Sequence, residues 1–137
     1  MINSLLEAQK DGKGFHWVVI HEKIIVGLVS LIDVRRNHRA WTLNRAELAY
    51  WVAPAAQSRG YATEAAWAVM NFAFGRLAFH KLIVYHAADN PSSAHVVKKL
   101  GFRHVGNERE AFCKHGIWHD LSHYELLESE YYANNHI

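Results

Sequence analysis

The chain of 137 residues has one cysteine, two prolines and no long apolar run, and these shortages exclude several classes of protein. Cys113 has no partner for an internal disulfide, and no zinc-ligand pattern accompanies it. No apolar stretch reaches the roughly 18 residues that a membrane span requires, so we expect no membrane partner. The first ten residues lack the basic, apolar and small-residue segments of a secretory signal, which predicts a cytoplasmic location.

The charge of the chain is close to balanced, with a formal net charge of +2 and a pI near 8.7. This mild positive excess suits an anionic cofactor but is too small for a nucleic-acid-binding surface, so no nucleic-acid partner is expected. The dense basic cluster at residues 35–39 lies between two strand-like segments and is interpreted as a solvated loop. Half of the residues are hydrophobic, which excludes disorder and predicts one globular domain over residues 1–137.

Eleven histidines raise the question of a metal site, and His119 and His123 are the most suggestive pair. On a helix, residues at this spacing share a face and could hold zinc. The surrounding segment reads as a strand, in which the two side chains would stand roughly 13 Å apart. We therefore expect no metal.

The order of predicted elements indicates an α+β fold with a mixed, mostly antiparallel sheet. A helical crossover joins the third and fourth strands, which must therefore be parallel. The predicted elements are the end of a helix at 2–9, strands at 15–21, 24–33 and 45–53, a helix at 61–75, a strand at 81–87, a helix at 92–100 and a final hairpin at 102–108 and 118–127.

The turn at residues 57–62 is the strongest candidate for a ligand site. It places small residues, including Gly60 and Ala62, between an apolar strand and the first turn of an apolar helix. The first N–H groups of a helix lack intrahelical partners and favour an anion, and Arg59 adds a fixed positive charge. The sequence therefore predicts a phosphate-binding turn.

Two motifs resemble those of the GNAT superfamily of acetyl-CoA-dependent N-acetyltransferases. The first is Gln57-x-x-Gly60-x-Ala62, and the second is residues 90–102, which begin with Asn-Pro-Ser-Ser and end in Leu-Gly-Phe. Their order and spacing are similar to those of the family. The resemblance covers residues 15–127 and implies that acetyl-CoA is the co-substrate.

The resemblance also implies that the third and fourth strands splay apart and admit the pantetheine arm of the cofactor. The cofactor-binding residues that it implies are Tyr50, Trp51, Val52, Gln57, Ser58, Arg59, Gly60, Tyr61, Ala62, Thr63, Asn90 and Ser93. Family members usually begin with a further strand and a helix, which we expect to be missing here, and the resemblance then implies either a truncated member or a chain that another subunit covers. The strand at 15–21 would then have an open edge, which predicts a homodimer.

Glu47 is the predicted general base for removing a proton from the acceptor amine. Residues 46–51, Ala-Glu-Leu-Ala-Tyr-Trp, match a segment of the branch that acetylates protein N-termini, where a carboxylate stands at this position. Apolar neighbours should raise its pKa and make it a better base. A structural carboxylate paired with Arg45 or a loop arginine remains an alternative, and Glu110 is a second possible base. Asp120 is expected to anchor the last hairpin.

Ser93 is the candidate for protonating the departing thiolate, because Val97 occupies the position at which many relatives carry a tyrosine. Asn90 would orient the pantetheine amides, and a backbone N–H near Val52 would polarise the thioester carbonyl. Ser93 could equally serve only to start a helix.

The predicted function is acetyl transfer to a primary amine, most like the enzymes that act on the N-termini of ribosomal proteins. Two alternatives remain open from the sequence. One is acetylation of a small amine such as an antibiotic or polyamine, and the other is a non-catalytic acyl-CoA-binding domain.

Overall fold

The computed structural model of the protein describes residues 4–11 and 14–134. These residues form seven strands, three α-helices and one short 3₁₀ helix. The strands are β1 (Ser4–Asp11), β2 (Gly14–His21), β3 (Ile24–His38), β4 (Trp41–Val52), β5 (Lys81–Ala87), β6 (Arg103–Lys114) and β7 (Ile117–Leu127). The helices are η1 (Pro54–Ala56), α1 (Tyr61–Gly75), α2 (Pro91–Lys99) and α3 (Glu128–Asn134).

One mixed sheet organises the molecule, with the strand order β1-β2-β3-β4-β5-β7-β6. Every neighbouring pair is antiparallel except β4 and β5, which α1 connects as a parallel crossover. This confirms the α+β class and the parallel relation predicted from the sequence. The bounds of α1 are also those predicted, because its apolar run begins after the Gly60 turn and ends at Gly75.

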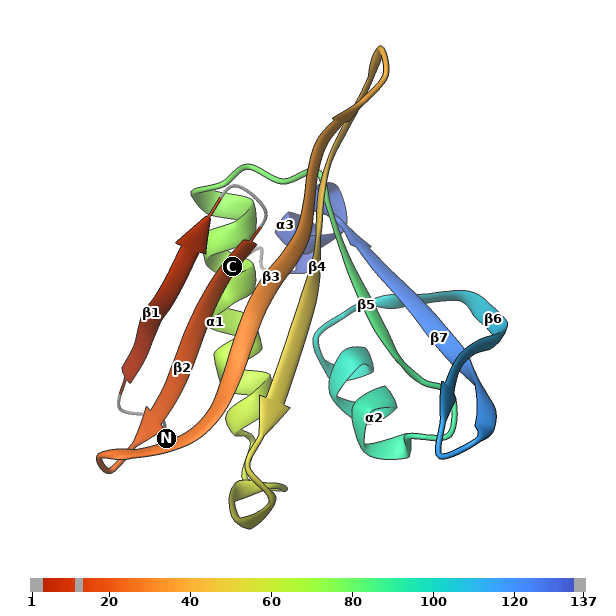
Figure 1. The fold of residues 1–137 in the computed structure, drawn as a ribbon. Helices are drawn as coiled ribbons and strands as arrows, with labels where there is room; N and C mark the ends of the chain where they lie inside the picture. The colour runs from red at the N-terminus through yellow and green to blue at the C-terminus, as the bar shows by residue number, and fades with distance from the viewer. Residues whose placement is uncertain (1–3, 12–13, 135–137) are drawn as a thin grey trace.

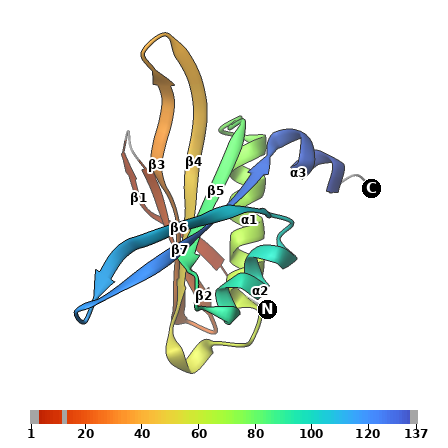
Figure 2. The same ribbon diagram turned by 90° about the vertical axis from the view of Figure 1, so that its right-hand side faces the viewer.

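The three helices lie on one side of the sheet (Figure 2). Helix α1 packs on β3 and β4, and its buried residues include Val69, Met70 and Phe74. Leu31 of β3 and Leu48 of β4 meet this helix from the sheet and are almost fully buried. Among the described residues, no helix covers the opposite face, which we call the outer face of the sheet.

The parallel junction between β4 and β5 is short. Only three residue pairs align, Arg45 with Lys81, Ala46 with Leu82 and Glu47 with Ile83. Beyond Glu47 the two strands diverge, as Figure 1 shows between β4 and the β5–β7 pair. The predicted splay is thus confirmed, and it begins at the predicted base.

The prediction of a helix over residues 2–9 is wrong where the structure describes it. Residues 4–11 form β1, which pairs antiparallel with β2, for example Leu5 with Val19. Residues 4–11 contain helix-forming residue types, but their helix propensity is weak. Pairing with the open edge of β2 overrides it. The edge that motivated the homodimer is therefore occupied by β1. The homodimer itself remains a prediction.

The basic cluster at residues 35–39 was predicted to be a solvated loop. The structure instead places residues 35–38 in strand β3. Strand β3 continues to His38 and returns as β4, forming a long hairpin that projects beyond the rest of the sheet (Figures 1 and 2). Arg36 fixes its base, since its guanidinium lies 4.2 Å from the centre of the Phe79 ring and donates to Leu77 O at 3.1 Å. Helix α3 was not predicted, and Tyr131 stacks on Phe74 to hold it against α1.

Candidate active site

A cavity of about 690 Å³ opens where β4 and β5 diverge. Its walls come from three places that are separate in the sequence: the end of β4, the turn that leads into α1, and the first turn of α2. The lining residues are Tyr50, Trp51, Val52, Ala56, Gln57, Ser58, Gly60, Tyr61, Ala62, Asn90, Pro91, Ser92, Ser93 and His95.

The turn before α1 has the geometry of an anion site. Gly60 caps the helix in the left-handed region, with φ of 78°, and no side chain caps the first N–H groups. The first helical hydrogen bond runs from Glu64 N to Gly60 O at 3.0 Å, so the amides of the first turn before Glu64 lack intrahelical partners. These amides and the positive end of the helix favour a phosphate in the cavity.

The backbone of β4 presents alternate peptide groups to the diverging gap. Ala53 N–H donates to Val26 O of β3 at 2.8 Å, and Gln57 Nε2 donates to Val52 O at 3.4 Å. The N–H and C=O of one strand residue point to the same side, and the side alternates along the strand. The polar groups of Val52 and Tyr50 therefore face the gap, which fits a donor to a thioester carbonyl and to an extended amide chain.

Tyr50 and Ser93 connect the two walls of the cavity. The Tyr50 hydroxyl lies 3.0 Å from Ser93 Oγ, in a partly buried contact between β4 and α2. Burial raises the pKa of Tyr50, and the hydrogen bond to Ser93 opposes that rise. Tyr50 therefore stays protonated over the physiological range and keeps a proton available to this pair.

Asn90 caps α2 instead of pointing freely into the cavity. Its side-chain oxygen accepts from Ser93 N at 3.1 Å, the bond expected of an N-cap residue. The helix-start role weighed for Ser93 is thus confirmed at its amide, while its hydroxyl contacts Tyr50 and its role as a proton donor stays a prediction. Asn90 is itself one of the residues that line the cavity.

The cavity brings together most of the residues predicted to bind the cofactor. Arg59 and Thr63 are the exceptions, because neither is among the lining residues. Four further lining residues were not predicted from the sequence, namely Ala56, Pro91, Ser92 and His95. His95 lies one helical turn after Pro91 on α2, so its place on the cavity side could have been read from helical periodicity.

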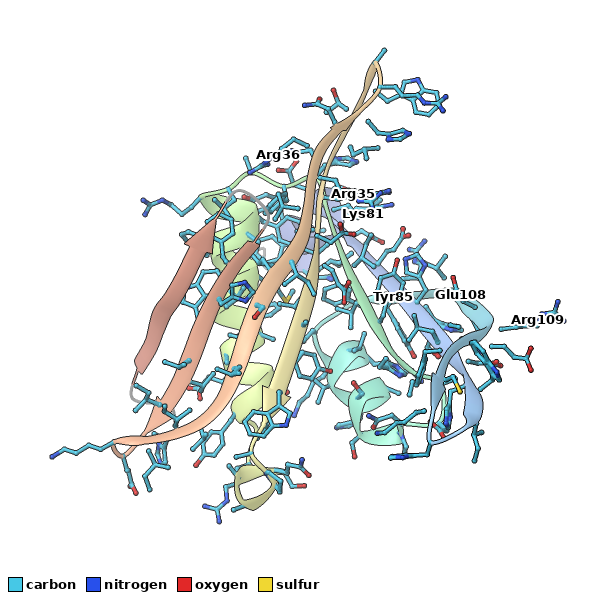
Figure 3. The ribbon with its side chains drawn as sticks, viewed as in Figure 1. Arg35, Arg36, Lys81, Tyr85, Glu108 and Arg109 are labelled. Carbon is cyan, nitrogen blue, oxygen red and sulfur yellow. The ribbon has the colours of Figure 1, made fainter. Side chains whose placement is uncertain are left out.

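Glu47 lines a second, smaller cavity of about 110 Å³ on the outer face. Alternation along β4 explains the separation, because Ala46 and Leu48 are buried beneath α1 and Glu47 between them faces the other way. The cavity is lined by Asp33, Arg35, Arg45, Ala46, Glu47, Ile83 and Tyr85. Figure 3 shows Arg35 and Lys81 at the closed end of the junction and Tyr85 farther along β5.

The surroundings of Glu47 make it a stronger base than a free carboxylate. Burial raises its pKa above the usual 4.5, and the negative charge of Asp33 raises it further. No ion pair joins Glu47 to Arg45 or to any other described residue within the usual 4 Å limit. The pairing with Arg45 or a loop arginine that the sequence left open is therefore not observed, and the role of Glu47 as a base stays a prediction.

The other candidates from the sequence lie apart from this cavity. Glu110 is on β6 and lines neither cavity. Asp120 accepts from Glu110 N at 2.8 Å and so anchors the irregular part of the β6–β7 hairpin, as expected. Val97 is fully buried, so a residue at that position of α2 contacts the core.

No group of three or more metal-ligating side chains forms a metal site among residues 4–11 and 14–134. Within the same residues, no helix has the length and apolar character to cross a membrane.

Residues 1–103 match the family of the acetyltransferase (GNAT) domain. The chain therefore belongs to the GNAT family of acetyltransferases. This confirms the family that the two motifs indicated.

Two curated relatives illustrate the range of acceptors in proteins similar to this chain. The spermidine N(1)-acetyltransferase of Vibrio cholerae is 30% identical over 110 residues, which are 80% of this chain and 61% of that protein. The Bacillus subtilis protein named "Putative ribosomal N-acetyltransferase YdaF" is 27% identical over 121 residues, which are 88% of this chain and 63% of that protein. The chain thus spans about three fifths of the length of these relatives.

Solved structures agree with the fold. Mutant forms of the spermidine/spermine N-acetyltransferase SpeG from Vibrio cholerae superpose with a TM-score of 0.82 at 28% identity, over 91% of this chain and 70% of that one. A crystal structure of a protein called a probable acetyltransferase gives a TM-score of 0.81 at 27% identity, over 88% of this chain and 65% of that one. The mixed sheet with a diverging central pair is therefore the fold of this family.

Proposed function

We propose that the protein transfers an acetyl group from acetyl-CoA to a small primary amine. The observation that carries this proposal is the placement of two cavities at one strand. Tyr50 and Val52 line the large cavity, and Glu47 lines the small one on the outer face. Glu47 and Tyr50 are three residues apart on β4, about 10 Å along an extended chain. Cofactor and acceptor would approach the junction from different sides.

The large cavity has the chemistry to hold acetyl-CoA. Helix α1 offers free amides at Gly60 and the next residues for the pyrophosphate, and β4 offers backbone groups to the pantetheine amides. The amide of Val52 would donate to the thioester oxygen as negative charge develops there. Backbone groups would make these contacts, which fits the small side chains in the turn.

Glu47 would accept the proton of the acceptor amine, directly or through water. The amine nitrogen then attacks the thioester carbonyl carbon, the carbon–sulfur bond breaks, and the acetyl group remains on nitrogen. The Tyr50–Ser93 pair would return a proton to the departing thiolate, so that CoA leaves as a thiol. Protonation is balanced overall, because one proton leaves the amine and one joins the sulfur.

The acceptor is proposed to be a small amine in preference to a protein N-terminus. The sequence had favoured the ribosomal N-terminal branch, whereas the relatives that match include spermidine acetyltransferases. The volume of the outer cavity, about 110 Å³, also suits one alkylamine end better than a folded terminus with its flanking residues.

The test is release of CoA thiol from acetyl-CoA with two acceptors, spermidine and a peptide with a free N-terminus and no lysine. We expect turnover with spermidine and little with the peptide. Turnover only with the peptide would restore the N-terminal acceptor. Acetyl-CoA binding without transfer to either amine, in a folded protein, would instead support the non-catalytic acyl-CoA-binding alternative.

A further inference from the structure

Strand β3 contains an irregularity directly after the residue that pairs with Glu47. Ile32 pairs with Glu47 and Arg35 pairs with Arg45, so two residues of β3 oppose the single residue Ala46 of β4. This two-to-one count is a β-bulge, a feature that changes the direction of a side chain. Asp33 is one of the two residues opposite Ala46 and has a positive φ of 49°.

The bulge determines which face Asp33 occupies. Leu31 is buried under α1, and Ile32 faces outward with its cross-strand partner Glu47. In a regular strand the next residue would again face the helix side. Here Val34 packs against the core instead, and Asp33 lines the outer cavity with Glu47.

A salt bridge holds Asp33 in this position. Arg35 Nε donates to Asp33 Oδ1 at 3.2 Å, so the residue on the far side of the bulge fixes the carboxylate. Both side chains are more than half exposed, and this pair alone adds little stability. Its effect is local, because it keeps a second carboxylate beside Glu47.

We propose that Asp33 is a positioning residue for the general base: the bulge aims its carboxylate at Glu47 and so keeps Glu47 ready to accept a proton from the acceptor. The proposal rests on the proposed function, since it needs Glu47 to act as a base. Asp33 acts through Glu47, because a nearby negative charge disfavours a second one and increases the affinity of Glu47 for a proton.

Charged and titratable groups surround Glu47 on its own strand and on both neighbouring strands, and of their charges that of Asp33 raises its pKa. The groups around it are Asp33 and Arg35 on β3, Arg45 on β4, and Lys81 and Tyr85 on β5. Lys81 is engaged by Glu125 of β7 at 3.3 Å. Glu108 of β6 raises the pKa of Tyr85 and is not among the charges that act on Glu47.

The test is a carbon-13 NMR titration of the Glu47 carboxyl in the full chain, with the signal assigned by its loss in Glu47→Gln. Asp33→Asn should move the Glu47 midpoint to lower pH, and asparagine tolerates the positive φ, so the bulge is kept. Arg35→Gln should move the midpoint to higher pH, because it removes a cation and frees the charge of Asp33. Glu108→Gln is the control and should leave the midpoint unchanged.

Kinetics supply a second measurement. At a pH below the wild-type midpoint and with saturating amine, Asp33→Asn should raise kcat about threefold, since more Glu47 is ionised. A folded Asp33→Asn protein with an unchanged midpoint would overturn the proposal, as would shifts of the same sign in Asp33→Asn and Arg35→Gln. Failure of the proposed function is distinguishable, because it would leave the titration intact while the wild type transfers no acetyl group.

Discussion

The hydroxyl groups of Tyr50 and Ser93 lie 3.0 Å apart although the residues are 43 positions apart in the chain. One hydroxyl comes from the strand that forms one wall of the large cavity, and the other comes from the helix that forms the facing wall. Side chains that join two walls of a pocket can position a ligand, hold the walls together or pass a proton. Two substitutions separate these roles.

Ser93→Ala should lower kcat about tenfold and change acetyl-CoA affinity little, because a proton donor acts mainly in the transition state. Tyr50→Phe should have a similar effect if the two hydroxyls act as a pair, and the double variant should be no slower than the worse single variant. Each change should also cost about 0.5–1.5 kcal/mol of stability through the lost hydrogen bond. Ser92→Ala is the matched control, and equal loss in that variant would argue against a specific role for Ser93.

The phosphate site can be tested at Gly60 with two substitutions of nearly equal shape. Asparagine and aspartate both tolerate the left-handed conformation that Gly60 adopts, with φ of 78°, better than most residues. Gly60→Asp should bind CoA about tenfold more weakly than Gly60→Asn, because only aspartate puts a negative charge beside the phosphates. Calorimetry measures both affinities. Equal affinities in two folded variants would place the phosphates elsewhere.

The role of Glu47 can be read from the pH dependence of transfer. Its pKa is raised, so wild-type activity should fall as the pH decreases through a value above 4.5. Glu47→Gln should lose about a hundredfold in rate and lack this acid limb, while binding acetyl-CoA normally. A Glu47→Gln enzyme with the wild-type profile would redirect attention to Glu110.

Glu47 also predicts a pH dependence of stability. A raised pKa in the folded state means that folding favours the protonated carboxyl, and this contribution is lost as the pH rises through the folded pKa. Glu47→Gln should therefore be more stable than the wild type at neutral pH, and the difference should shrink as the pH falls towards 4.5. Urea unfolding of both proteins at several pH values provides the measurement. A difference that grows on acidification would contradict the assigned direction.

Gly27 is required by the close approach of β3 and β4 near the large cavity. A Cβ at this position would lie inside the van der Waals contact distance of Trp51 O, which is backbone and cannot move aside easily. Gly27→Ala should therefore lower the free energy of unfolding by about 1–3 kcal/mol. Gly75→Ala is the control, since nothing lies within 4 Å of its added Cβ, and its stability should be unchanged or slightly higher. Denaturant unfolding compares the two.

Much of the fold could be predicted because local patterns and tertiary structure agree. The apolar run of α1, its glycine turn and the alternation of β5 each carry a strong local signal. Residues 4–11 could not be assigned in this way. Their composition favours a helix, and only the free edge of β2, which forms from other residues, makes them a strand.

The same distinction separates the predicted and missed parts of the candidate site. The cofactor turn is continuous in sequence and was predicted, whereas the outer cavity is assembled from three strands. Asp33 and Tyr85 join Glu47 there only because of a bulge in β3 and the parallel register of β5. No spacing rule in the sequence encodes a bulge, so Asp33 read as an ordinary strand end.

The three-pair ladder between β4 and β5 has a consequence for the molecule as a whole. The sheet consists of a four-stranded part, β1 to β4, and a three-stranded part, β5 to β7. The two parts are paired at only one end of the β4–β5 junction. Under the proposed function, the pantetheine arm binds along β4 where β4 and β5 diverge, and so acts as a temporary eighth strand. Amide hydrogens of Tyr50 and Val52 should then exchange with solvent much more slowly when CoA is bound. The bound cofactor would thus be a hydrogen-bonded part of the sheet until it leaves.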